Sequence, residues 1–137
     1  MKLNNRLSLV LLLLRLSVFL VMLMWTIDKF VRPEHAAAVY ENFYFIGGLN
    51  NSIFYLIGAL QLAIIIGFLL GYQKKITYGA VLLLHGISTL SSFAKYLAPF
   101  SNGNLLFYAA WPMLAACFAL YYLRDLDTRW VIDKRGG

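Results

Sequence analysis

The sequence predicts an all-α protein, a membrane-embedded bundle of four helices, and three observations support this fold class. The chain of 137 residues is 61% hydrophobic with a mean hydropathy of +0.71, which is more apolar surface than a soluble domain of this size could cover. Four apolar runs have about the 20 residues that cross a hydrocarbon core. Turn residues and charges separate these runs, which predicts helices over about 7–31, 52–71, 76–98 and 104–123.

The first run is preceded by Lys2 and Arg6 and therefore looks like a signal peptide. However, Arg15 interrupts the apolar stretch, and no small-residue cleavage motif follows it promptly. We interpret this segment as an uncleaved first transmembrane helix.

The loop after the first run contains a short helix of its own, predicted over about 33–45. Pro33 suits a first helical position, and Glu34 suits the positive end of the helix dipole. The apolar and polar residues separate onto opposite faces, so the helix is expected to lie on the membrane surface. We expect Gly47 and Gly48 to end it. The apolar face contains Ala36, Val39, Tyr40 and Phe43.

Small residues indicate how the helices pack, because helices in lipid associate by close van der Waals contact. In the second run Ala59, Ala63, Gly67 and Gly71 recur every fourth residue, which predicts a central, closely packed helix. In the fourth run Pro112 removes a backbone donor and predicts a kink.

The third run has the most polar face of the four. Polar side chains are costly in hydrocarbon, so this face is expected to point into the bundle, a cavity or another subunit. A serine or threonine can instead satisfy its hydroxyl on the preceding helical turn. The face contains His85, Ser88, Thr89, Ser92, Lys95 and Tyr96.

Arg15 poses the main question, because no Asp or Glu lies within the apolar runs themselves, 7–27, 52–70, 76–98 and 105–123, to neutralise it. Burying an arginine there costs at least about 2.5 kcal/mol, less whatever reaching toward the headgroups recovers. Its partner could be a lipid phosphate, a polar ligand or an acid on another protein. Gln61 and His85 lie at a similar predicted depth, so the three residues are a candidate buried polar centre; the alternative is an arginine that reaches the interface beside two structural hydrogen bonders.

The net charge of +6 is interpreted as a record of membrane orientation rather than of nucleic-acid binding. Most basic residues fall at the termini and in the turn at 71–75, which predicts that both ends are cytoplasmic in a multi-pass protein of the cell's inner membrane. Residues 124–137 are expected to form a mobile cytoplasmic tail.

The sequence lacks the apparatus of an independent enzyme. It contains no nucleotide-binding loop, no HExxH motif and no pair of carboxylates within the apolar runs. Cys117 is the single cysteine, which excludes an internal disulfide, and His35 and His85 are too far apart in the predicted topology to share a metal. We therefore predict no catalytic residues, no metal and no certain cofactor.

The first run and the residues after it carry a motif formed by Arg15, Trp25, Asp28, Lys29 and Pro33, followed by Glu34. This motif resembles that of the DoxX-like family of small four-helix membrane proteins. An early arginine, an aromatic residue, a D/G-K pair and a proline recur in that order in this family. The second run also matches the family's glycines at Gly58, Gly67 and Gly71, but Gln61 stands where an acid is common. Any role of that acid is therefore in doubt for this chain.

The resemblance implies a small membrane subunit or accessory factor of a redox system, quinone-linked or thiol-related, that works beside a protein partner or as a homo-oligomer. One alternative is a quinone- or lipid-binding redox subunit that uses the Arg15, Gln61 and His85 centre, with the polar face of the third run relaying protons. A second alternative is an oligomeric transporter, and Arg15 would favour an anionic or neutral solute.

Overall fold

The computed structural model describes residues 2–135, a part of the chain that contains helices and no strand. The all-α class is therefore confirmed. The longer helices are α1 (Leu3–Val31), α3 (Asn51–Leu69), α4 (Lys74–Ser91) and α6 (Ala110–Tyr122). The shorter elements are the helices α2 (Pro33–Tyr44) and α5 (Phe93–Leu97) and the 3-10 helices η1 (Asn104–Ala109) and η2 (Arg124–Leu126).

Within residues 2–135, three helical stretches are long and apolar enough to cross a membrane. They are α1, α3 and the stretch Asn104–Tyr122 that joins η1 to α6, with mean hydropathies of 2.6, 2.2 and 1.5. These helices indicate a membrane protein. Because α4 begins with Lys74 and Lys75 and contains His85, it is less apolar, and its role as a fourth span stays a prediction.

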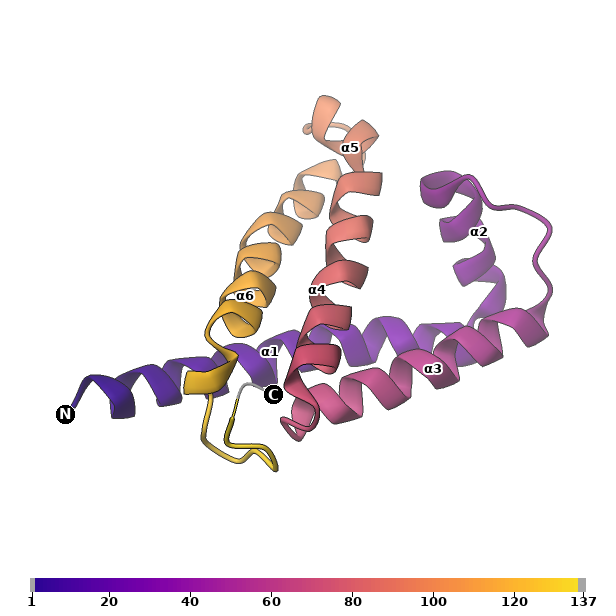
Figure 1. Ribbon diagram of the computed structural model, residues 1–137. Coiled ribbons are helices and arrows are strands. Elements are labelled where there is room, and N and C mark those ends of the chain that lie inside the picture. The colour runs from indigo at the N-terminus through magenta and orange to yellow at the C-terminus, as the bar shows by residue number, and fades with distance from the viewer. Residues whose placement is uncertain (1, 136–137) are drawn as a thin grey trace.

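The long helices form two pairs, as Figure 1 shows. Helices α1 and α3 run antiparallel side by side, while α4 and α6 form a second pair that leaves the first at a steep angle. A single bundle of four near-parallel helices therefore stays a prediction. The core lies where the pairs meet and is formed by Leu11, Val18, Met22, Ile65, Phe68, Tyr78, Val81, Cys117 and Leu120.

Helix α2 follows α1 after a sharp corner and begins with Pro33 at its first position. Its apolar face is turned inward. Ala36 is buried, and the Tyr40 ring packs edge-on against the ring of Phe54 of α3, with the ring centroids 5.2 Å apart. The left-handed residue that ends the helix is Phe45, with φ 59°, and not one of the two glycines predicted for that role.

Two interruptions differ from the sequence prediction. The helix predicted over 76–98 is broken at Ser92, so that Lys95 lies in α5 rather than in α4. Pro112 lies in the first turn of α6, directly after the 3-10 helix η1. The proline therefore accompanies the change from 3-10 to α-helix, and a kink at this position stays a prediction.

The small residues of α3 do not form one packing face. Ala59 and Ala63 are exposed, whereas Gly58 and Gly67 are buried. A Cβ atom on Gly58 would lie 2.8 Å from the Phe30 ring, so this glycine allows α1 and α3 to approach closely. The prediction of a continuous small-residue interface is therefore wrong.

Candidate functional site

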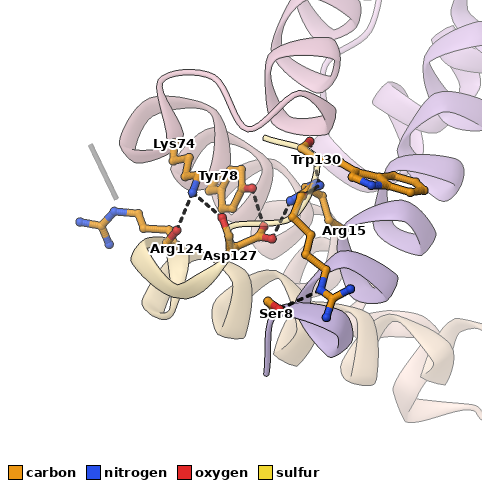
Figure 2. Close-up of polar contacts among 8 residues, drawn as sticks. Ser8, Arg15, Lys74, Tyr78, Arg124, Asp127 and Trp130 are labelled. Atoms are coloured by element: carbon orange, nitrogen blue, oxygen red, sulfur yellow. Dashed lines mark hydrogen bonds and ion pairs between the residues drawn. The ribbon is translucent and has the colours of Figure 1, made fainter. Parts of the chain in front are cut away.

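The buried Arg15 of α1 forms an ion pair with a residue far along the same chain. Its Nη1 lies 2.6 Å from Oδ1 of Asp127, which follows η2 in the C-terminal segment. The exposed fractions of the two side chains are 1% and 0%, so both charges are removed from solvent. Figure 2 shows the two groups pointing toward one another.

Two residues of α4 complete the surroundings of Asp127. The Tyr78 hydroxyl donates to the second carboxylate oxygen, Oδ2, at 2.6 Å. The Nζ of Lys74 donates to the main-chain oxygens of Asp127 and Arg124, at 2.5 and 2.9 Å (Figure 2). The carboxylate therefore connects α1 to α4 through both of its oxygens.

The residues after Asp127 are bound to α1 as well. Arg15 donates from Nη2 to the main-chain oxygens of Arg129 and Trp130, at 2.6 and 3.2 Å. In return the Arg129 guanidinium donates to the Ser8 hydroxyl at 2.9 Å and to the main-chain oxygen of Asn5 at 3.2 Å. The C-terminal segment therefore lies against the first turns of α1.

The same segment also pairs with the turn between α3 and α4. The backbone N–H groups of Ile132 and Asp133 donate to the main-chain oxygens of Leu70 and Gly71, at 2.8 and 3.1 Å. The Asp133 carboxylate accepts a hydrogen bond from the backbone N–H of Gln73 at 2.8 Å. The expectation of a mobile tail is wrong for residues up to Asp133, because this segment contacts two other parts of the protein.

The Arg15 cluster, which consists of Arg15, Lys74, Tyr78 and Asp127, concentrates positive charge. Its buried members Arg15 and Lys74 are basic and only Asp127 is acidic. Among the residues described, Arg15 Nε is a buried donor without a hydrogen-bond partner, so the guanidinium is only partly satisfied. Nine Lys and Arg residues and three Asp residues lie in residues 2–15, in residues 74–75 and in residues 124–135, the segments that form or adjoin the cluster. The three basic and three acidic residues elsewhere cancel, so these segments account for the whole net charge of +6.

The structure gives Arg15, Gln61 and His85 different surroundings. The guanidinium of Arg15 is occupied by the C-terminal segment. His85 Nε2 lies 3.0 Å from the main-chain oxygen of Ala110, which connects α4 to the start of α6. Gln61 is half-buried on α3. The three side chains therefore share no hydrogen-bond partner in the described part of the chain.

The polar face of the third predicted helix is largely satisfied by its own backbone. The hydroxyl of Thr89 donates to the main-chain oxygen of His85 at 2.7 Å, and that of Ser92 to the oxygen of Ser88 at 3.0 Å. The Tyr96 hydroxyl donates to the main-chain oxygen of Thr89 at 2.8 Å. This pattern matches local helix stabilisation, which the sequence left open, rather than a chain of side chains that passes a proton.

The motif at the end of α1 shapes the corner between α1 and α2. Asp28 forms an ion pair with Arg32 at 2.7 Å and contacts Nδ1 of His35 at 2.6 Å. The His35 ring stacks on Trp25 with centroids 6.4 Å apart, and Lys29 Nζ donates to the main-chain oxygen of Trp25. Pro33 is buried and Glu34 is exposed. These contacts bring Asp28, Trp25 and the first turn of α2 together at one corner.

Asp127, Tyr78 and Lys74 were not predicted as site residues. The one available signal was that all six Asp and Glu residues lie at or outside the ends of the apolar runs, so the partner of Arg15 had to come from outside them. Nothing in the spacing distinguishes Asp127 from Asp125 or Asp133. Residues 2–135 contain no group of three His, Cys, Asp or Glu side chains that could bind a metal.

Comparisons with protein-family models, with curated proteins and with solved structures find no match to this chain. The resemblance to the DoxX-like family therefore depends on the short motif and the glycines of α3. It stays a prediction.

Proposed function

We propose that this protein is a small multi-pass subunit or accessory factor of a redox system in the cell's inner membrane, with no catalytic centre of its own. One observation carries the proposal. Arg15 is the single charged residue within the apolar run 7–27 of α1, and its guanidinium binds Asp127 and two main-chain oxygens of its own chain. The Arg15 guanidinium, which is the group best suited to bind a substrate, therefore binds the C-terminal segment of its own chain instead.

The other polar candidates support the same proposal. His85 bonds a main-chain oxygen, and Thr89 and Ser92 bond the preceding turn, so these groups stabilise helices. The redox assignment and the inner-membrane location come from the family resemblance and the distribution of basic residues. The quinone-binding and transport alternatives gain no support from these contacts.

The test begins with the full-length protein purified in mild detergent from its native membrane. Mass spectrometry then identifies the proteins and quinones that are present in fixed stoichiometry. We expect a redox enzyme as partner, and we expect its activity in membranes to fall when the gene for this chain is deleted. Wild-type protein and the His85→Ala and Gln61→Ala variants should restore that activity equally.

Two outcomes would contradict the proposal. A stoichiometric quinone that is lost from a folded His85→Ala variant would support the quinone-binding alternative. Unchanged redox activities in the deletion strain, with no protein in fixed stoichiometry, would remove the accessory role altogether.

A further inference from the structure

A cavity of about 320 Å³ lies at the end of the protein opposite the Arg15 cluster, between the end of α2 and α5. Three aromatic rings, Phe43, Phe45 and Phe93, form much of its wall. Asn42, Ser91 and Ala94 line it as well, and Lys95 provides a charge. An apolar cavity with a few polar groups has the composition of a small-molecule site.

Lys95 has no carboxylate partner among residues 2–135. Its Nζ lies 5.8 Å from the centre of the Phe43 ring and 5.6 Å from that of Phe107, and these two rings are themselves 5.9 Å apart. Two aromatic rings therefore position the ammonium group without neutralising it. An anion bound beside Lys95 would supply the missing charge.

A second cavity of about 490 Å³ continues the first one along α4. The two share Phe43, Phe45, Ser91 and Phe93, and the second extends to Ile87 and Leu90. Ile87 and Leu90 are 48% and 66% exposed, so this part is open at the side of the protein. We name the combined feature the α2–α5 groove; it places a cation at one end and apolar side chains along the remainder.

We propose that the α2–α5 groove binds an anionic phospholipid, with the phosphate beside Lys95 and one acyl chain along Phe93, Leu90 and Ile87. The apolar part of the groove is open at the side of the protein, as an acyl chain requires. An anionic headgroup brings net negative charge to Lys95, whereas the phosphate of a zwitterionic headgroup is already paired with the headgroup's own cation. Lysine at the end of a membrane helix lies at the depth of the lipid headgroups, where a phosphate is present. The inference depends on the membrane placement in the proposed function but not on the redox partner.

The backbone at Phe45 provides a second observation at the same place. Phe45 has φ 59°, a left-handed conformation that is rare for a bulky residue, and its side chain is 77% exposed. Strained residues of this kind concentrate at ligand-binding positions. A bound acyl chain would cover the exposed ring.

The experiment uses the full chain in lipid nanodiscs that contain a trace of phosphatidylglycerol with a photoreactive diazirine in one acyl chain. After irradiation, mass spectrometry locates the cross-linked peptides. We expect labelling to concentrate on residues 42–45 and 87–94. Lys95→Gln should reduce this labelling about fivefold, the contribution of one interfacial lysine to anionic-lipid binding. A diazirine phosphatidylcholine should label the groove weakly and should not respond to this substitution.

Two further variants make the test specific. Lys75→Gln removes an exposed lysine from the opposite end of α4 and should leave groove labelling unchanged. Ser91→Trp fills the cavity without changing charge and should abolish groove labelling by both lipids. Thermal unfolding of each variant verifies that it is folded.

The inference is overturned if labelling spreads evenly over exposed residues such as Leu83 and Leu106, or if Ser91→Trp has no effect. It is also overturned if cross-linking shows that a second copy of the chain occupies the groove. A protein that enters nanodiscs normally but leaves the groove unlabelled contradicts this inference alone. Failure to enter nanodiscs would contradict the proposed function as well.

Discussion

Arg15 and Asp127 are separated by 112 positions in the sequence and form a buried ion pair at 2.6 Å. One partner lies within an apolar helix, and the other lies in a polar segment that connects to no further helix among the residues described. The pair therefore makes the C-terminal segment part of the folded protein.

Asp127→Ala should destabilise the protein by about 3–5 kcal/mol, because it leaves Arg15 buried without its counter-charge. Unfolding in detergent, followed by circular dichroism, measures this loss. Asp125→Ala is the matched control, since Asp125 is exposed in the same segment and should change stability by less than about 0.5 kcal/mol. The double variant Arg15→Leu with Asp127→Leu should lose less than Asp127→Ala alone; an equal or larger loss would mean that the unpaired charge is not the cause.

Tyr78→Phe should cost about 1–2 kcal/mol, because it removes the hydroxyl that donates to Asp127 while the Arg15 ion pair remains. The same unfolding assay measures the effect. Tyr122→Phe alters a ring that is 69% exposed and should be neutral. If both substitutions had the same small effect, the hydrogen bond of Tyr78 would contribute nothing to stability.

Gly71→Ala should release the C-terminal segment. Gly71 has φ +62°, and a Cβ atom at this position would overlap the Val131 side chain. Limited proteolysis should then cut within residues 124–135 faster than in the wild type. Gly103→Ala is a close control, since Gly103 has φ +78° but nothing within 4 Å of the added atom. Equal protease sensitivity of the two variants would show that backbone strain alone is responsible.

Phe45→Gly should stabilise the protein by about 1 kcal/mol, because glycine adopts the left-handed conformation without a steric penalty. Unfolding in lipid-free detergent measures the gain. Ile46→Gly is the comparison, since Ile46 is also exposed but is not a positive-φ residue, and it should not become more stable. A loss of stability in Phe45→Gly would mean that the ring contributes more to packing than the backbone strain costs.

Membrane orientation can be tested with single cysteines in a Cys117→Ser background. Lys75→Cys lies in the first turn of α4, near the basic end, and Asn102→Cys lies between α5 and η1. The positive-inside rule predicts that a membrane-impermeant maleimide added to spheroplasts labels Asn102→Cys and not Lys75→Cys. The opposite labelling pattern would reverse the orientation.

The sequence predicts the apolar helices well and their interactions poorly. Hydrophobic length alone identifies α1 and α3, and Pro33 marks the start of α2, because these are local signals. The end of α2 at Phe45 could not be foreseen, because a phenylalanine in a left-handed conformation contradicts local preference. In the same way, the steep crossing of the two helix pairs has no counterpart in the hydrophobic pattern (Figure 1).

The candidate site, like the fold, could be predicted from the sequence only in part. Arg15 is conspicuous because it is a charge within an apolar run, whereas Asp127 is one of three aspartates in a short polar segment. Only the fold reveals that Asp127 is fully buried while Asp125 is exposed. The sequence indicates His85 as a candidate ligand-binding group, because its partner, a main-chain oxygen of Ala110, cannot be identified from residue types.

The separation of Arg15 from Asp127 in the sequence also means that the two partners are synthesised at different times. A ribosome that adds about 5–20 residues per second makes Asp127 several seconds after Arg15. During that interval Arg15 is present in the nascent chain without the carboxylate that it binds in the folded protein. The ion pair can form only after α6 and η2 have been made, so a chain truncated before Asp127 would retain a buried arginine without its counter-charge.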